Sequence, residues 1–255
     1  MDIHLTFYSS QLKSRMTQII CLANSWKRGE RCIAGINPNN GEWIRPVSDL
    51  TDGRIPKTMR QINRREPALL DILEIPLGQT GADFGFEKEN RSVLPGKWQK
   101  KGKLKPTDLL KYCDNPKYIL HNQQRYVSIS FMQSLPEAQR QTLQLIVAIA
   151  FSAKAVGKRF EGSEKWEGTV KTQTGETLTA TITDPVFTRK LELGYRPQNP
   201  CLVTVSLSMP WRPDDWEKDD PCWKLIAGVV ELPENFITPA IEVETETEND
   251  DEIIF

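Results

Sequence analysis

The chain has 255 residues, with 33 Lys and Arg against 34 Asp and Glu, so its formal net charge is −1 at neutral pH. Seven of the acids fall within residues 242–255, which contain no base. Residues 1–241 therefore hold 33 bases against 27 acids, a net charge of +6. The charge of a segment bears on its partners more directly than the total. A basic body and an acidic tail are predicted, and the near-zero total does not exclude a polyanion as ligand.

The cysteine and histidine content argues against a disulfide-stabilised protein and against a metal-binding one. The five cysteines are scattered, odd in number and without a C-x-x-C pair, as expected of reduced thiols in a cytoplasmic protein. They are Cys21, Cys32, Cys113, Cys201 and Cys222. The two histidines, His4 and His121, lie far apart in the sequence, so we expect no metal site. No motif for a cofactor occurs, and none is expected.

Neither a membrane span nor a secretory signal is predicted. The most apolar stretch, residues 141–153, falls short of the roughly 20 apolar residues that cross a bilayer. Residues 1–15 lack the order of charge, apolar core and small residues that a signal peptide has. They are treated as an N-terminal extension, and the sequence is compatible with a translation start at Met1 or at Met16.

Short β-strands separated by turn residues are predicted along most of the chain. Runs rich in β-branched and apolar residues, ended by Gly, Pro or Asn, form two groups. The first comprises residues 17–23, 31–36, 42–47 and 69–75, and the second comprises residues 143–149, 168–171, 177–183, 202–207 and 225–232. The turn NPNNG at residues 37–41 predicts a hairpin from the runs on either side of it.

Helical signals are few, and they suggest where the chain divides. Helices are expected at residues 107–112 and 136–144, the second with Pro and Glu in its first turn. Strands of this length favour small barrels or sandwiches. A division at residue 136 gives a first domain at 16–135, a second at 136–238 and a tail at 239–255.

Several strings together resemble the bacterial dual OB-containing domain family. The most specific are CLANS-x-K at residues 21–27, RCIAG at 31–35 and WIRPVS at 43–48. Supporting strings, in the same order along the chain, are LDILEIP at 70–76, Glu89-Asn90, TDP at 183–185, CLVTVSL at 201–207 and WKLIA at 223–227. The resemblance implies a mainly β fold of two tandem OB-like five-stranded barrels with a few short helices and a disordered acidic tail. It also implies nucleic-acid binding, and it brings no catalytic residues.

The predicted hairpin and the loop before it are the first candidate surface. Strand alternation places Trp43 and Arg45 on one face, where an indole and a guanidinium suit a stacked base and its phosphate. The neighbouring polar residues, also candidates for nucleic-acid contact, are Asn24, Ser25, Lys27, Arg28 and Arg31. Alternatively, Trp43 packs in the barrel, Arg45 ties down a polar loop, and Asn24 and Ser25 belong to a turn.

Two basic segments are the second candidate surface. Residues 54–65 and 91–105 are rich in Lys and Arg, and the latter segment surrounds a tryptophan. Gly and Pro predict a loop there, which can follow a phosphate backbone while the indole stacks on a base. The binding residues expected from these segments are Arg60, Arg64, Lys97, Trp98, Lys100, Lys101 and Lys103. The alternative is a solvated, purely structural surface.

The last six residues form a third candidate, for contact with another protein. Asp250, Asp251, Glu252, Ile253, Ile254 and Phe255 resemble the C-terminal tip of bacterial single-stranded DNA-binding proteins. Such a tip can place its terminal aromatic ring in an apolar pocket and present its carboxylate to a base. The alternative is a solubilising tail.

The acidic stretch around Trp211, Trp216 and Trp223 should repel phosphates and is expected to be an aromatic plug or a protein contact.

These features predict a non-enzymatic protein that binds single-stranded nucleic acid, DNA in preference to RNA. Its tail would recruit proteins of replication, recombination or repair.

The alternative is a protein- or small-ligand-recognition module of a bacterial conflict or regulatory system, with a polar pocket at Asn24, Ser25, Lys27 and Arg45. A metal-dependent nuclease ranks last, since Asp71 and Glu74 point to opposite sides of one strand. A continuous basic groove past Trp43 and Trp98 would favour strand binding, and a closed pocket would favour the alternative.

Overall fold

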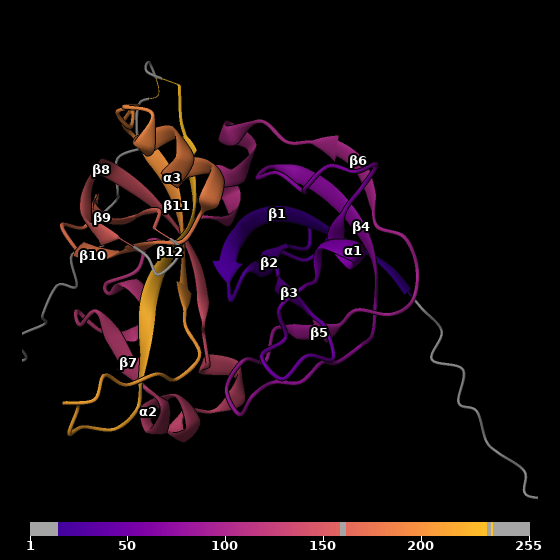
Figure 1. Cartoon of the computed structure of the whole chain (residues 1–255), viewed down its shortest axis with the longest axis horizontal. Coiled ribbons are helices and arrows are strands. Elements are labelled where there is room, and N and C mark those ends of the chain that lie inside the picture. Colours follow the sequence, from indigo (N-terminus) through magenta and orange to yellow (C-terminus); the bar gives the residue numbers. More distant parts are fainter. Residues whose placement is uncertain (1–14, 159–161, 234–235, 237–255) are drawn as a thin grey trace, which may run out of the picture.

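The computed structural model in Figure 1 describes residues 15–158, 162–233 and 236. The predicted tail and nearly all of the N-terminal extension lie outside these residues. The fold is mainly β with few helices, as expected. Each group of strands forms its own curved sheet, and the two sheets pack against each other. Within the described residues, every helix is too short or too polar to span a bilayer.

The first sheet has the strand order β5-β3-β2-β1-β4-β6. Its strands are β1 (Arg15–Lys27), β2 (Glu30–Ile36), β3 (Trp43–Val47), β4 (Asp71–Leu77), β5 (Asn90–Ser92) and β6 (Gln99–Lys103). The sheet curls into a half-barrel, in which β5 pairs in parallel with β3 and a bridge joins Leu77 to Val93. The unit closes less fully than a regular barrel because β5 is only three residues long.

The second sheet is a closed barrel. Its strands are β7 (Tyr126–Ser128), β8 (Leu143–Lys158), β9 (Glu164–Thr172), β10 (Thr177–Ile182), β11 (Cys201–Leu207) and β12 (Pro221–Glu231), in the order β10-β9-β8-β11-β12-β7. A parallel pairing of β10 with β12 closes the five main strands. The short β7, which precedes the expected domain boundary, adds to the edge of β12.

The helices are short and connect the strands. They are α1 (Lys57–Arg60), α2 (Ile129–Ser134) and α3 (Pro185–Glu192), with 3-10 turns η1 (Pro106–Tyr112), η2 (Ile119–His121) and η3 (Glu137–Gln139). The helix expected at residues 136–144 is wrong beyond η3. Leu143 and the apolar residues after it enter β8, because they are buried on both faces of the strand.

A continuous apolar seam joins the two units, and β1 lies beside β12 in Figure 1. Ile20 and Leu22 of β1 pack with Leu145, Leu202 and Val230 of the second sheet. Each such side chain contributes about 1.5 to 3 kcal/mol when fully buried. At Gly228 a Cβ atom would lie 2.2 Å from the carbonyl oxygen of Leu22, so no other residue fits there without displacing a strand. The seam fixes the position of one unit against the other.

Candidate nucleic-acid interface

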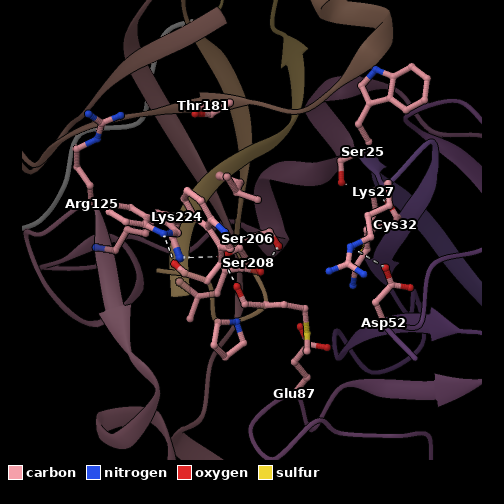
Figure 2. Close-up of a pocket in the computed structure, with 18 of the residues that line it drawn as sticks. Ser25, Lys27, Cys32, Asp52, Glu87, Arg125, Thr181, Ser206, Ser208 and Lys224 are labelled. Carbon is pink, nitrogen blue, oxygen red and sulfur yellow. Dashed lines mark hydrogen bonds and ion pairs between the residues drawn. The ribbon is translucent and has the colours of Figure 1, made fainter. Parts of the chain in front are cut away.

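A cleft of about 790 Å³ opens between the two units. Figure 2 shows Ser25, Lys27 and Asp52 of the first unit on one side and Arg125 and Lys224 of the second on the other. The elements that form it are the β1–β2 turn, the loop between β4 and β5, the β11–β12 loop, and parts of β9 and β10. OB-folds bind ligands with the loops between strands 1 and 2 and strands 4 and 5, and with the face of strands 2 and 3. Here such elements of both units converge on one cleft.

Tryptophans line the cleft from both sides. Trp26, near the end of β1, is 40% exposed, and Trp211, in the β11–β12 loop, is 63% exposed. Trp223 lines the wall between them, and its indole N–H donates to the Trp211 carbonyl oxygen at 2.8 Å. Trp216 packs edge-on against Trp223 and Tyr126, with ring centroids 5.4 and 4.9 Å away. The β11–β12 loop thus has its own aromatic packing and still presents Trp211 to the cleft.

A second groove of about 980 Å³ lies next to the cleft, and the two share Trp26, Arg28, Lys165 and Thr181 in their linings. Together they hold more bases than acids. The eight bases are Lys27, Arg28, Arg31, Arg45, Arg125, Lys165, Arg189 and Lys224, and the five acids are Asp52, Glu87, Glu164, Glu167 and Glu192. The joined surface is therefore moderately positive, which suits an anionic ligand.

Several of these bases already have a carboxylate partner. Arg125 pairs with Glu167, and Arg189 pairs with Glu192 at 3.0 Å. Arg28 lies 3.7 Å from Asp52, and its own side chain is 76% exposed. In the part of the chain that the structure describes, Lys27, Arg31 and Lys165 have no carboxylate within ion-pair distance. Lys224 also lacks a carboxylate partner but donates to Asn122, so Lys27, Arg31 and Lys165 are the cations left to bind an anion.

A buried charge network forms the floor of the cleft. The Arg45 guanidinium, 2% exposed, pairs with Glu87 and, at 2.9 Å, with Glu89. It also donates to the Thr142 hydroxyl at 3.0 Å, and Thr142 donates to Glu89. Burial lowers the pKa of Arg45, but Glu87 and Glu89 outweigh it, so the net shift is upward. The predicted contact of Arg45 with phosphate is therefore corrected: Nη1 and Nη2 are taken up by Glu87, Glu89 and Thr142, and Nε is buried without a partner among the described residues. The residue ties the β4–β5 loop to the second unit.

The other predicted stacking residues are also turned inward. Trp98 is 4% exposed and packs in the core of the first unit, so a groove past both Trp43 and Trp98 is excluded. Trp43 is half-buried against the seam. Arg60 is 4% exposed and is held by Glu30 and Glu66. The physical reason is tertiary for Trp98 and Trp43, which pack against strands distant in the sequence, whereas Arg60 pairs with the nearby Glu66 as well as with the distant Glu30.

The basic segment at residues 91–105 is not the predicted loop. Residues 99–103 form β6, the edge strand beside β4. Lys100 and Lys101 pair with Asp71 and Glu74 at 2.5 and 2.8 Å. Lysines on an edge strand also discourage pairing with another sheet. Three further predicted residues, Arg64, Lys97 and Lys103, are exposed but line neither hollow.

The β1–β2 turn is the predicted element that does reach the cleft. Ser25, Lys27 and Arg28 line the cleft, and Arg31 lines the second groove. Asn24 is buried and donates to the Pro67 carbonyl oxygen at 2.6 Å, a structural role. Trp26, Arg125 and Lys165 were not among the predicted binding residues, and Trp211, expected in an aromatic plug or protein contact, is exposed in the lining of the cleft. For Trp26 a signal existed, because a two-residue turn at Arg28-Gly29 places it directly opposite Arg31.

Lys224, in the wall of the cleft, gives a testable pH dependence. It is 3% exposed, and its Nζ donates to the carbonyl oxygen and Oδ1 of Asn122. Burial lowers the pKa of Lys224 from 10.5 to about 8. Between these values the unfolded chain binds more protons, so the free energy of unfolding rises with pH through that window. Urea unfolding should show wild type gaining about 2 kcal/mol more than Lys224→Met from pH 8 to pH 10.5. If the free energies of unfolding of wild type and Lys224→Met changed in parallel with pH, this prediction would be contradicted.

Among the described residues, no group of three or more His, Cys, Asp or Glu side chains is placed to hold a metal ion. The described carboxylates nearest the cleft instead pair with arginines, as Glu87 does with Arg45 and Glu167 with Arg125.

No curated protein matches the sequence. Among solved structures, the chain is similar to the crystal structure of the p204 HINb domain, with 10% sequence identity, a TM-score of 0.28, and coverage of 87% of this chain and 94% of that one. The model of the family described as the dual OB-containing domain matches residues 17–229. Since that match spans both sheets, the chain belongs to the dual OB-containing domain family.

Proposed function

We propose that the protein binds single-stranded nucleic acid, DNA in preference to RNA, in the cleft between its two units, and that it does so without catalysis. One observation carries the proposal. The exposed Trp26, at the end of strand 1 in one OB unit, and Trp211, in the strand 4–5 loop of the other, line the same positively charged cleft. OB-folds use these elements for oligonucleotides.

The chemistry of the cleft suits unpaired nucleotides. Base stacking on an aromatic side chain is worth about 1 to 3 kcal/mol and tolerates any sequence, since every base has a π-face. Trp26 and Trp211 offer such faces, and Lys27 and Lys165 lie beside them without a carboxylate partner among the described residues. A duplex keeps its bases paired and stacked, so the two indoles would gain nothing from it. The arrangement favours single strands.

A binding titration tests this proposal. Single-stranded and duplex oligonucleotides of the same sequence are titrated at about 50 and 200 mM salt. With three to five phosphates neutralised, we expect single-strand affinity to fall roughly 10- to 100-fold between the two conditions. We also expect the duplex to bind more weakly than the single strand at both salt concentrations. Absence of single-strand binding, or binding that salt does not weaken, would overturn the proposal.

The same titration without residues 242–255 addresses the tail, which lies outside the described residues. We propose that its tip, Asp250 to Phe255, recruits replication, recombination or repair proteins, while its seven acids compete with nucleic acid for the basic cleft. Deletion should tighten strand binding several-fold at low salt and abolish capture of such partners. Phe255→Ala is the matched control, because it removes the aromatic tip but keeps the acids. It should abolish capture and leave strand affinity unchanged.

A second candidate is recognition of a small ligand or a protein segment in a conflict or regulatory system. It is favoured by the carboxylates Asp52, Glu87 and Glu167, which give the cleft a mixed lining rather than a uniformly basic one. A ligand of this class would raise the thermal unfolding temperature at high salt, where single strands have dissociated. Stabilisation by oligonucleotides alone, lost at high salt, would decide against it.

A further inference from the structure

Arg31 has an unusual environment on the turn between β1 and β2. It pairs across the hairpin with Trp26, and its Cζ lies 3.9 Å from the centroid of the Trp26 ring. The guanidinium is therefore stacked flat against the indole, a contact worth about 0.5 to 2 kcal/mol. Stacking covers one face of the cation but satisfies none of its N–H donors. Arg31 still needs acceptors at its edges.

The carboxylates around Arg31 are engaged elsewhere. Glu30 and Glu66 both hold Arg60, with an Arg60 Nε–Glu66 distance of 2.6 Å. Asp184 accepts from the backbone N–H groups of Val186 and Phe187 at 2.9 and 3.1 Å, where it caps α3. All three acids attract Arg31 from a distance, but none is paired with it. Arg31 therefore has no carboxylate of its own within ion-pair distance among the described residues, although these three acids outnumber the one other cation, Arg60.

The Arg31 donors are left unsatisfied inside the protein. Nε and Nη1 are shielded from solvent and have no hydrogen-bond partner among the described residues. Burial lowers the pKa of Arg31 from its usual value, and the nearby charge of Arg60 lowers it further. A buried donor without an acceptor costs about 1 to 3 kcal/mol, and more when it is charged. Such a group gains most from an anion that supplies the missing acceptors.

The second groove provides a route for that anion. Arg31 lines it together with Arg28, Lys165 and Arg189, whereas Trp26 lines both this groove and the main cleft. A strand that stacks a base on Trp26 in the cleft would pass its backbone directly beside Arg31. The indole that shields the guanidinium is also the indole placed to receive the base.

We propose that Arg31 is a phosphate-binding residue that Trp26 covers in the free protein, and that Trp26 exchanges this contact for a base when a strand binds. The exchange frees the guanidinium to turn, so that Nε and Nη1 can donate to phosphate oxygens in the planar geometry that a guanidinium offers. This inference rests on the proposed function for its natural ligand, a phosphodiester. The underlying anion site is a property of Arg31 itself, so inorganic phosphate shares the chemistry.

The first test compares Arg31→Met, Arg31→Lys and Arg196→Met in strand titrations over a range of salt. Arg196 is an exposed arginine outside both hollows and serves as the matched control. Arg31→Met should weaken binding about tenfold and reduce the steepness of the salt dependence by about one phosphate contact. Arg31→Lys should keep the steepness but lose part of the affinity, and Arg196→Met should match wild type. An Arg31→Met variant with unchanged salt dependence would overturn the inference, while strand binding itself would still stand.

The second test uses inorganic phosphate, followed by calorimetry, and does not require strand binding. Trp26→Ala removes the cover, so we expect it to bind phosphate severalfold more tightly than wild type, although it binds strands more weakly. The double variant Trp26→Ala with Arg31→Met should lose the gain. Equal phosphate affinity in wild type and Trp26→Ala would rule out that Trp26 shields Arg31 from anions. If no form of the protein binds single strands, the proposed function fails, and the phosphate measurements still decide whether Arg31 is an anion site.

Discussion

Arg45→Met should lower the free energy of unfolding by about 3 to 5 kcal/mol. The substitution leaves Glu87 and Glu89, which are 2% and 6% exposed, without the cation that balances them. Burial already raises the pKa of Glu89, and Glu87 raises it further against the opposing effect of Arg45. Without the guanidinium, two carboxyl groups would face each other in a site that water does not reach.

Urea denaturation of three variants measures this effect. Arg212→Met is the control, because Arg212 lies 3.4 Å from Asp220 with both side chains well exposed, and its loss should cost less than about 1 kcal/mol. Combining Arg45→Met with Glu87→Gln and Glu89→Gln removes all three charges and should recover part of the loss. If Arg45→Met and Arg212→Met proved equally mild, the network would have no role in holding the units together.

Trp26→Ala should weaken single-strand binding by about 1 to 3 kcal/mol, or roughly 5- to 150-fold. Trp26 is 40% exposed in the cleft wall, so its loss removes a stacking surface without opening a core. The free energy of unfolding should fall by no more than the roughly 0.5 to 2 kcal/mol of the Trp26–Arg31 contact, so the folded protein is retained and the effect on binding can be measured separately. Fluorescence anisotropy of a labelled single strand gives the affinities.

Trp43→Phe is the matched comparison for Trp26→Ala. Trp43 is half-buried at the seam, and phenylalanine retains most of its packing there. Its strand affinity should stay within twofold of wild type. Should Trp43→Phe weaken binding while Trp26→Ala does not, the binding surface would lie on the β2–β3 hairpin and not in the cleft.

The fold could be predicted from the sequence because the residues that indicate each strand and turn are neighbours in the chain. The β1, β2 and β3 runs carry β-branched residues and end at turn residues, and the β2–β3 hairpin has its predicted turn. The strand predicted at residues 143–149 lies in β8, and only the helix predicted at residues 136–144 runs too far, because Pro and Glu before an apolar run also occur at a helix start. Burial on both faces, which decides in favour of a strand, is a property of the assembled barrel.

The site could be predicted from the sequence only in part, because several of its side chains meet partners that are distant in the sequence. The β1–β2 turn was predicted to bind, and its Lys27 and Arg28 do line the cleft. Strand alternation correctly separates Arg45 from Ile44, but it cannot show that Glu87 and Glu89 meet Arg45 from a loop forty residues away. In the same way, the basic segment around Trp98 depends on Asp71 and Glu74 of a neighbouring strand.

The contact between Gly228 and Leu22 has a consequence for how a ligand is received. Where two backbones touch without an intervening side chain, the units have no layer of side chains along which to slide, so we expect the width of the cleft to change little when a ligand binds. Apart from side chains such as Trp26, most of the conformational entropy lost on binding should then be lost by the ligand. Stiff or already stacked strands should therefore associate at lower entropic cost than fully flexible ones of the same charge.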